Sequence, residues 1–129
     1  MSKFFLVAAA VLGALSVALG AFAAHGLKKI VSPDVLVTFE TGVRYQFYHT
    51  FALLATGILL ERIPGQSLTW AGYSFLVGVI LFSGSLYLMV GLKAAQNAGL
   101  GAVGIITPIG GLFLIAGWIF LLTGILKKN

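Results

Sequence analysis

Long stretches without a charged side chain are the feature that most limits how this chain can fold. Residues Phe4 to Ala24 contain no Asp, Glu, Lys, Arg or His, and an α-helix needs about 20 apolar residues to cross a bilayer. Three more predominantly apolar stretches follow, at about 43–60, 68–92 and 101–126. We therefore predict an all-α integral membrane protein, a four-helix bundle whose first span covers about 4–24.

The composition agrees with a lipid environment. The chain of 129 residues is 60% hydrophobic and 9% charged, with a mean hydropathy of +1.08, whereas soluble domains are about half apolar and a quarter charged. A water-soluble protein of this size has too little interior to hide so much apolar surface. We expect residues 1–129 to form one transmembrane domain.

Composition also excludes several classes of function. The chain has no cysteine, so disulfides, zinc–thiolate sites and thiol chemistry are excluded. Its net charge of +5 comes from scattered basic residues, which indicates membrane lipids rather than nucleic acid as partners. The motifs G-x-S-x-G, H-E-x-x-H and the phosphate-binding loop do not occur, so no catalytic residue is assigned.

The first apolar stretch has a second interpretation as a secretory signal peptide. Lys3 precedes it, and Ala21 to Ala23 resembles a small-x-small cleavage site. The stretch is longer than the usual apolar core of a signal peptide, which favours a retained membrane helix.

The stretch before the second span has the pattern of a helix. Ser32, Pro33 and Asp34 suit its N-cap, first position and first turn. Apolar residues then recur at helical spacing, at Leu36, Phe39, Val43 and Phe47. We predict an amphipathic interfacial helix over residues 33–42, with a bend at Gly42 where the chain enters the bilayer.

Thr107 and Pro108 interrupt the fourth apolar stretch. One straight helix over 101–126 would be about 40 Å long, against a hydrocarbon core of about 30 Å. Either Pro108 kinks a single helix, which we favour, or Thr107 caps a new helix that begins at Pro108.

Glycines are expected to hold the bundle together, because lipid provides no hydrophobic drive between helices and small residues let backbones approach closely. This packing role is assigned to Gly20 in the first span, Gly78 in the third, and Gly110, Gly117 and Gly124, seven residues apart, in the fourth.

The distribution of the basic residues gives little information on how the chain is oriented in the membrane. Four of them accompany the side that carries both termini, Lys3, Arg62, Lys127 and Lys128, and four accompany the other side, Lys28, Lys29, Arg44 and Lys93. We expect both termini in the cytoplasm.

Polar and ionisable side chains gather near the connection between the first two spans, at His25, Glu40, Arg44, Tyr45 and His49. Ionisable groups at membrane depth are costly, so each is a candidate functional residue. We expect Glu40 to pair with Arg44 one helical turn away. We also expect the Y-Q-F-Y-H segment to face inward, so that His49 reaches His25 across the helix contact.

Several interpretations of this polar site remain open. Its side chains could anchor the interfacial helix through mutual hydrogen bonds, or hold a quinone or a lipid headgroup. Alternatively, His25 and His49 could ligate a haem iron from both sides, or bind a transition metal with Glu40 as third ligand. Nothing in the sequence requires a metal or cofactor, and we expect none.

Four motifs resemble a known family. They are L-G-A-F-A-A-H-G-L, Y-Q-F-Y-H, L-F-S-G-S-L-Y and T-P-I-G-G-L-F-L-I-A-G-W, in this order. Together they resemble the family catalogued as domain of unknown function 423, also called uncharacterised protein family 0382, to which the animal transmembrane protein 256 is related. The resemblance implies a small multi-pass helical protein of the bacterial cytoplasmic (inner) membrane, and it implies no particular reaction.

The leading expectation is a non-enzymatic membrane module that binds lipid, a partner membrane protein or a second copy of itself. The alternative is a redox-linked membrane subunit with a quinone or a bis-histidine haem at the face of His25 and His49.

Overall fold

The computed structural model describes residues 1–95 and 101–127, and nearly all of them are helical. The elements are α1 (Ser2–Ala24), the short 3-10 helix η1 (Leu27–Lys29), α2 (Pro33–Arg62), α3 (Gln66–Ala94) and α4 (Gly101–Leu126). The all-α prediction is confirmed. Among the described residues, three segments are long and apolar enough to cross a membrane: Ser2–Lys29, Gln66–Ala94 and Gly101–Leu126.

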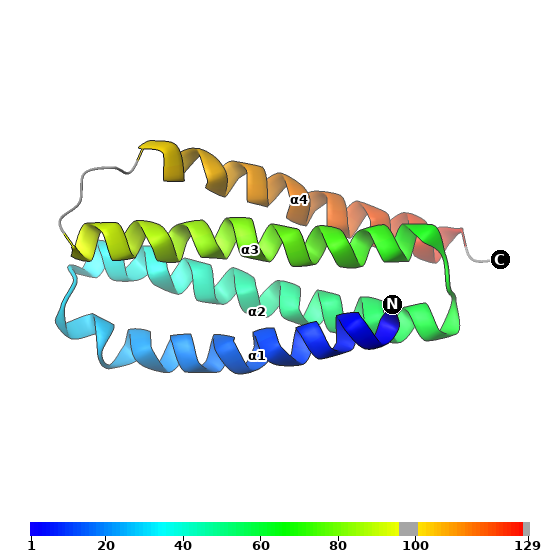
Figure 1. The fold of residues 1–129 in the computed structure, drawn as a ribbon, viewed down its shortest axis with the longest axis horizontal. Helices are drawn as coiled ribbons and strands as arrows, with labels where there is room; N and C mark the ends of the chain where they lie inside the picture. The colour runs from blue at the N-terminus through cyan, green and yellow to red at the C-terminus, as the bar shows by residue number, and fades with distance from the viewer. Residues whose placement is uncertain (96–100, 128–129) are drawn as a thin grey trace.

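The four long helices lie side by side in the order of the sequence, with α1 and α4 on the two outer sides (Figure 1). Each helix packs mainly against its neighbours in the chain. α1 begins and α4 ends at the same end of the molecule, and the turn between α2 and α3 lies at that end too (Figure 1).

α2 is one uninterrupted helix from Pro33 to Arg62, so the prediction of a separate helix over residues 33–42 with a bend at Gly42 is wrong. Gly42 has a different role, because it is buried against α3. A Cβ at this position would lie 2.8 Å from the Tyr87 ring and 3.4 Å from Leu86. The glycine therefore allows close packing and does not break the helix.

Two clusters of buried side chains hold the helices together. One joins α1, α2, α3 and α4 near the end with the chain termini, around Phe5, Leu53, Phe75 and Leu121. The other lies toward the opposite end, around Ala23, Leu27, Phe39, Val43 and Val90. The loop after α1 is fixed in the second cluster by Leu27.

Glycines of α4 allow close contact with α3. A Cβ on Gly117 would lie 2.6 Å from the Phe75 ring, and one on Gly124 would lie 2.8 Å from Leu68. The contact at Gly110 is tighter still, since a Cβ added there would meet the backbone of Phe82. Residues seven apart on one helix thus meet residues seven apart on the other, which keeps the same faces together along the whole contact.

Two other glycines named from the sequence also lie at helix contacts. A Cβ on Gly78 of α3 would lie 2.6 Å from Leu114 of α4, whereas one on Gly20 of α1 would lie 3.7 Å from Val43 of α2. Gly78 therefore allows a much closer approach than Gly20, which lies at an ordinary van der Waals contact.

Pro108 lies inside α4, which begins at Gly101. The single-helix alternative is therefore the one that the structure shows. Thr107 forms a hydroxyl–hydroxyl hydrogen bond with Ser85 of α3, so the polar group beside the proline has a partner on the neighbouring helix.

Candidate functional site

The register of α1 against α2 sets the depth of every candidate residue. Contacts between the two helices join Gly20 with Val43, Gly13 with Thr50, and Leu6 with Gly57, and the residue numbers in each pair add to 63. Tyr45 and Tyr48 therefore lie level with residues 18 and 15 of α1. At 1.5 Å per residue, these levels lie about 9 Å and 14 Å from the end of α1 at Ala24.

His49 faces α3 and α4. Its Nδ1 lies 2.8 Å from the carbonyl oxygen of Tyr45, and its Nε2 lies 3.0 Å from the indole nitrogen of Trp118. A carbonyl only accepts and an indole N–H only donates. The hydrogen bonds therefore assign the proton to Nδ1 and leave Nε2 as the acceptor, so both ring nitrogens of this buried imidazole are occupied.

Aromatic rings enclose the same imidazole. The Tyr45 ring stacks on it at 6.1 Å between centroids, and the rings of Phe75 and Trp118 each lie 5.8 Å away. Tyr45 is itself partly exposed and packs on Phe82 of α3 at 4.8 Å. This arrangement locks His49 in place and leaves no ring nitrogen free for a ligand.

His25 lies elsewhere. It ends α1, is exposed, and its Nδ1 lies 3.0 Å from the carbonyl oxygen of Ala21. The helix register places His25 level with residue 38 of α2, about 16 Å along the axis from His49 at 1.5 Å per residue. The prediction that His49 contacts His25 is therefore wrong. At this separation the two histidines cannot ligate one haem iron from both sides.

Glu40 and Arg44 do come together. They line a pocket of about 270 Å³ between α1 and α2, whose remaining walls are Gly20, Ala23 and Val43. Arg44 is exposed and Glu40 is half-buried. Within the described residues neither side chain has a hydrogen bond or an ion pair, so the expected pairing of Glu40 with Arg44 is absent, although both residues line the pocket.

The candidate residues therefore divide between two faces of α2. His49 and Tyr45 pack toward α3 and α4, whereas Glu40 and Arg44 face the α1 side. Only Gln46 and His49 of the Y-Q-F-Y-H segment are buried, while Tyr45 and Tyr48 are exposed. Within the residues that the structure describes, no group of three His, Cys, Asp or Glu side chains is placed to hold a metal ion.

A polar network in the middle of the bundle was not foreseen as a site. The side-chain amide of Gln46 donates to the Leu12 carbonyl oxygen at 3.0 Å and accepts from the Tyr87 hydroxyl at 2.6 Å. Ser83 donates to the Gly42 carbonyl oxygen at 2.6 Å. The network joins α1, α2 and α3, and a lone glutamine in an apolar helix is the signal that could have revealed it.

A groove lies directly over this network. It has a volume of about 280 Å³ and is lined by Leu12, Leu15 and Leu19 of α1, by Gln46 of α2, and by Val79, Ile80, Ser83, Gly84 and Tyr87 of α3. Leu15 and Ile80 are exposed at its rim. Gly84 leaves space there, because nothing lies within 4 Å of the position that its Cβ would occupy.

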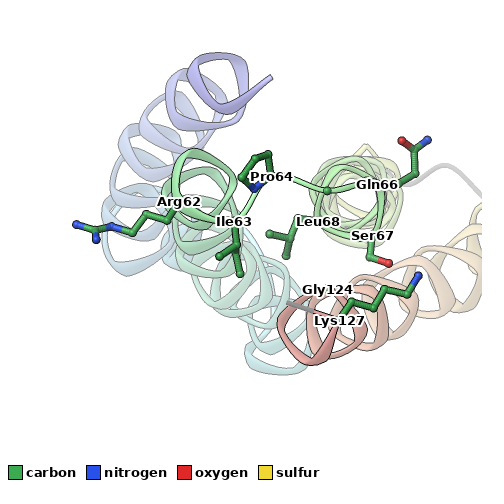
Figure 2. Close-up of a pocket in the computed structure, with 9 residues that line it drawn as sticks. Arg62, Ile63, Pro64, Gln66, Ser67, Leu68, Gly124 and Lys127 are labelled. Carbon is green, nitrogen blue, oxygen red and sulfur yellow. The ribbon is translucent and has the colours of Figure 1, made fainter. Parts of the chain in front are cut away.

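A further pocket of about 340 Å³ lies at the end of the bundle with the α2–α3 turn, and its lining includes Arg62, Ser67 and Lys127. Figure 2 shows Lys127 extended along the Ser67 side of this pocket, whereas the Arg62 side chain points away from it. The two cations therefore do not converge on a common anion.

Comparison with known proteins identifies the family. The family model described as "Protein of unknown function (DUF423)" matches residues 19–111. No solved structure matches the chain.

Curated relatives match almost the full length. The UPF0382 membrane protein YwdK of Bacillus subtilis is 39% identical over 126 residues, covering 97% of this chain and 98% of its own. The UPF0382 inner membrane protein YgdD of Escherichia coli K12 is 36% identical over 126 residues, covering 98% and 92%. With its three long apolar helices, the chain is a multi-pass protein of the bacterial inner membrane, and it belongs to the DUF423 (UPF0382) family.

Proposed function

We propose that this protein is a non-enzymatic membrane protein that binds the hydrocarbon chain of a lipid in the groove between α1 and α3. The observation that carries the proposal is the combination of apolar walls with a polar floor whose side chains are each already hydrogen-bonded within the protein. Gln46, Ser83 and Tyr87 all form their hydrogen bonds inside the protein. An occupant of this groove therefore needs no polar group.

The proposal includes α2 as a fourth membrane-crossing helix. α2 lies between α1 and α3 along its length (Figure 1), so a bilayer that surrounds its two apolar neighbours also surrounds α2. Its polar side chains are then at membrane depth, where Gln46 and His49 are accommodated because their partners come from other helices. The groove lies near the middle of α1 and α3 and opens onto acyl chains.

Gly84 supports a bound chain in a second way. Glycine in a helix costs about 1 kcal/mol relative to alanine, and at contacts such as Gly42 and Gly78 close packing explains it. A Cβ on Gly84 would meet no neighbouring helix within the described residues, yet Gly84 forms part of the groove wall. A side chain at this position would occupy the space that we assign to the lipid.

The test uses Gly84→Leu and, as a matched control, Gly91→Leu. Both glycines lie in α3 with nothing within 4 Å of the position that a Cβ would occupy, so both variants should fold, but only Gly84 lines the groove. The probe is diolein, which has acyl chains and neither phosphate nor amine. Native mass spectrometry should show about tenfold less diolein retained by Gly84→Leu than by Gly91→Leu. Equal retention by the two variants would contradict the proposal.

A further inference from the structure

Glu40 and Arg44 form an outward-facing pair of opposite charges below the end of α1. The register of α1 and α2 places Arg44 level with residue 19 and Glu40 level with Ala23, whereas α1 ends at Ala24. Side chains of a helix lean toward its N-terminus, so the Arg44 guanidinium leans toward the level of Glu40. If α1 crosses the bilayer over the length of its helix, the pocket between them lies close to the depth of the lipid headgroups.

The charges of this pocket require a partner. An arginine at membrane depth is costly unless an anion or hydrogen-bond acceptors satisfy it, and within the described part of the chain Arg44 has no bonded acceptor. A simple anion would satisfy Arg44 but would face the like charge of Glu40. An acidic side chain from a partner helix would likewise face the like charge of Glu40. A ligand that carries both signs, close together, satisfies both residues.

We propose that this pocket binds the headgroup of an aminophospholipid, with the phosphate on Arg44 and the primary ammonium on Glu40. The Cβ atoms of residues four apart on a helix lie about 5–6 Å apart, so a phosphate and a primary ammonium joined by one two-carbon link can reach both side chains. An arginine fork suits a phosphate, and an ammonium can donate hydrogen bonds to a carboxylate. A trimethylammonium headgroup cannot donate, so phosphatidylcholine should bind less well.

The small residues of α1 make room for this headgroup. Gly20 and Ala23 form the α1 wall of the pocket, and even a Cβ on Gly20 would make only an ordinary contact with Val43 across the helix pair. The pocket therefore keeps its space although α1 and α2 pack along their length. It shares no lining residue with the groove between α1 and α3, so either site can be absent without the other.

The experiment measures phospholipid retention by the full-length protein in gentle detergent with native mass spectrometry. Equal amounts of dioleoyl phosphatidylethanolamine, phosphatidylglycerol and phosphatidylcholine are supplied in competition. The wild type should retain phosphatidylethanolamine about tenfold over phosphatidylcholine, which is the effect of one charge-assisted hydrogen bond. Arg44→Gln should lower the retention of phosphatidylethanolamine and phosphatidylglycerol together. Glu40→Gln should remove the preference for phosphatidylethanolamine over phosphatidylglycerol while phosphatidylglycerol stays bound.

Matched controls come from the opposite end of α2, where Glu61 and Arg62 are also exposed. Glu61→Gln and Arg62→Gln should leave the lipid preference unchanged. Arg44→Lys keeps the charge and should keep part of the preference, which separates binding from misfolding if Arg44→Gln is unstable. Equal retention of the three lipids by the wild type would overturn the proposal, as would an unchanged preference in Glu40→Gln. Diolein retention tests the other groove independently.

Discussion

The residues at the centre of the bundle show how polar groups are accommodated in an apolar protein. His49 bonds to Tyr45 and Trp118, and Gln46 bonds to Leu12 and Tyr87. One partner of His49 and both partners of Gln46 lie on other helices. A buried donor or acceptor that lacks a partner costs about 1–3 kcal/mol, so these bonds fix which faces of the helices can meet.

Trp118→Phe should destabilise the protein by about 1 kcal/mol, because it keeps an aromatic ring but removes the N–H that the His49 Nε2 accepts. The control is Trp70→Phe, whose indole lies on the outer surface and is half exposed. Thermal unfolding in detergent measures both. A loss of stability that is the same in the two variants would show that the Trp118–His49 bond contributes nothing.

Two buried threonines of α2 should respond oppositely to the isosteric change to valine. Thr56 donates to the Ala52 carbonyl oxygen at 2.8 Å, whereas the buried Thr50 hydroxyl has no hydrogen-bond partner among the described residues. Thr50→Val should therefore be neutral or stabilising by about 1 kcal/mol, and Thr56→Val neutral or destabilising. The same unfolding assay applies, and a larger loss for Thr50→Val than for Thr56→Val would contradict the difference in hydrogen bonding between the two hydroxyls.

At the level of helices, the α3–α4 contact depends on glycines that the sequence pattern already marked. Gly110→Ala should destabilise the protein by about 1–3 kcal/mol, since its Cβ would meet the Phe82 backbone, which cannot rotate away. Gly104→Ala in the same helix meets nothing within 4 Å and should be neutral or stabilising. Similar stabilities of the two variants would show that α3 and α4 are not in close contact at Gly110.

The helices themselves could be predicted because each apolar stretch is a local property of the chain. The direction in which a side chain points is not local. His49 is bonded to Trp118, which lies in α4, and no nearby residue indicates that it faces away from His25. The role of Gly42 is equally hidden from the sequence, because its close contact is with Tyr87 of α3. Glu40 and Arg44 could be placed together, since helical spacing alone determines that they are neighbours.

For the whole molecule, the arrangement of the helices makes a prediction about sidedness. Because the chain has no cysteine, single cysteines can be introduced without background labelling. If all four helices cross the membrane, a membrane-impermeant thiol reagent should label Gln66→Cys and Lys127→Cys from one side and Lys29→Cys from the other. A protein in which α2 remained on the surface would instead present Lys29→Cys and Gln66→Cys on the same side.

We propose that the polar middle of α2 lies inside the bilayer, and the depth of Tyr48 tests this placement most directly. Tyr48 is exposed on the bundle surface and lies level with residue 15 of α1. A spin label on Tyr48→Cys in lipid vesicles should therefore collide often with oxygen, which concentrates in acyl chains, and rarely with a water-soluble nickel complex. Frequent collision with the nickel complex would place α2 at the membrane surface and contradict this account.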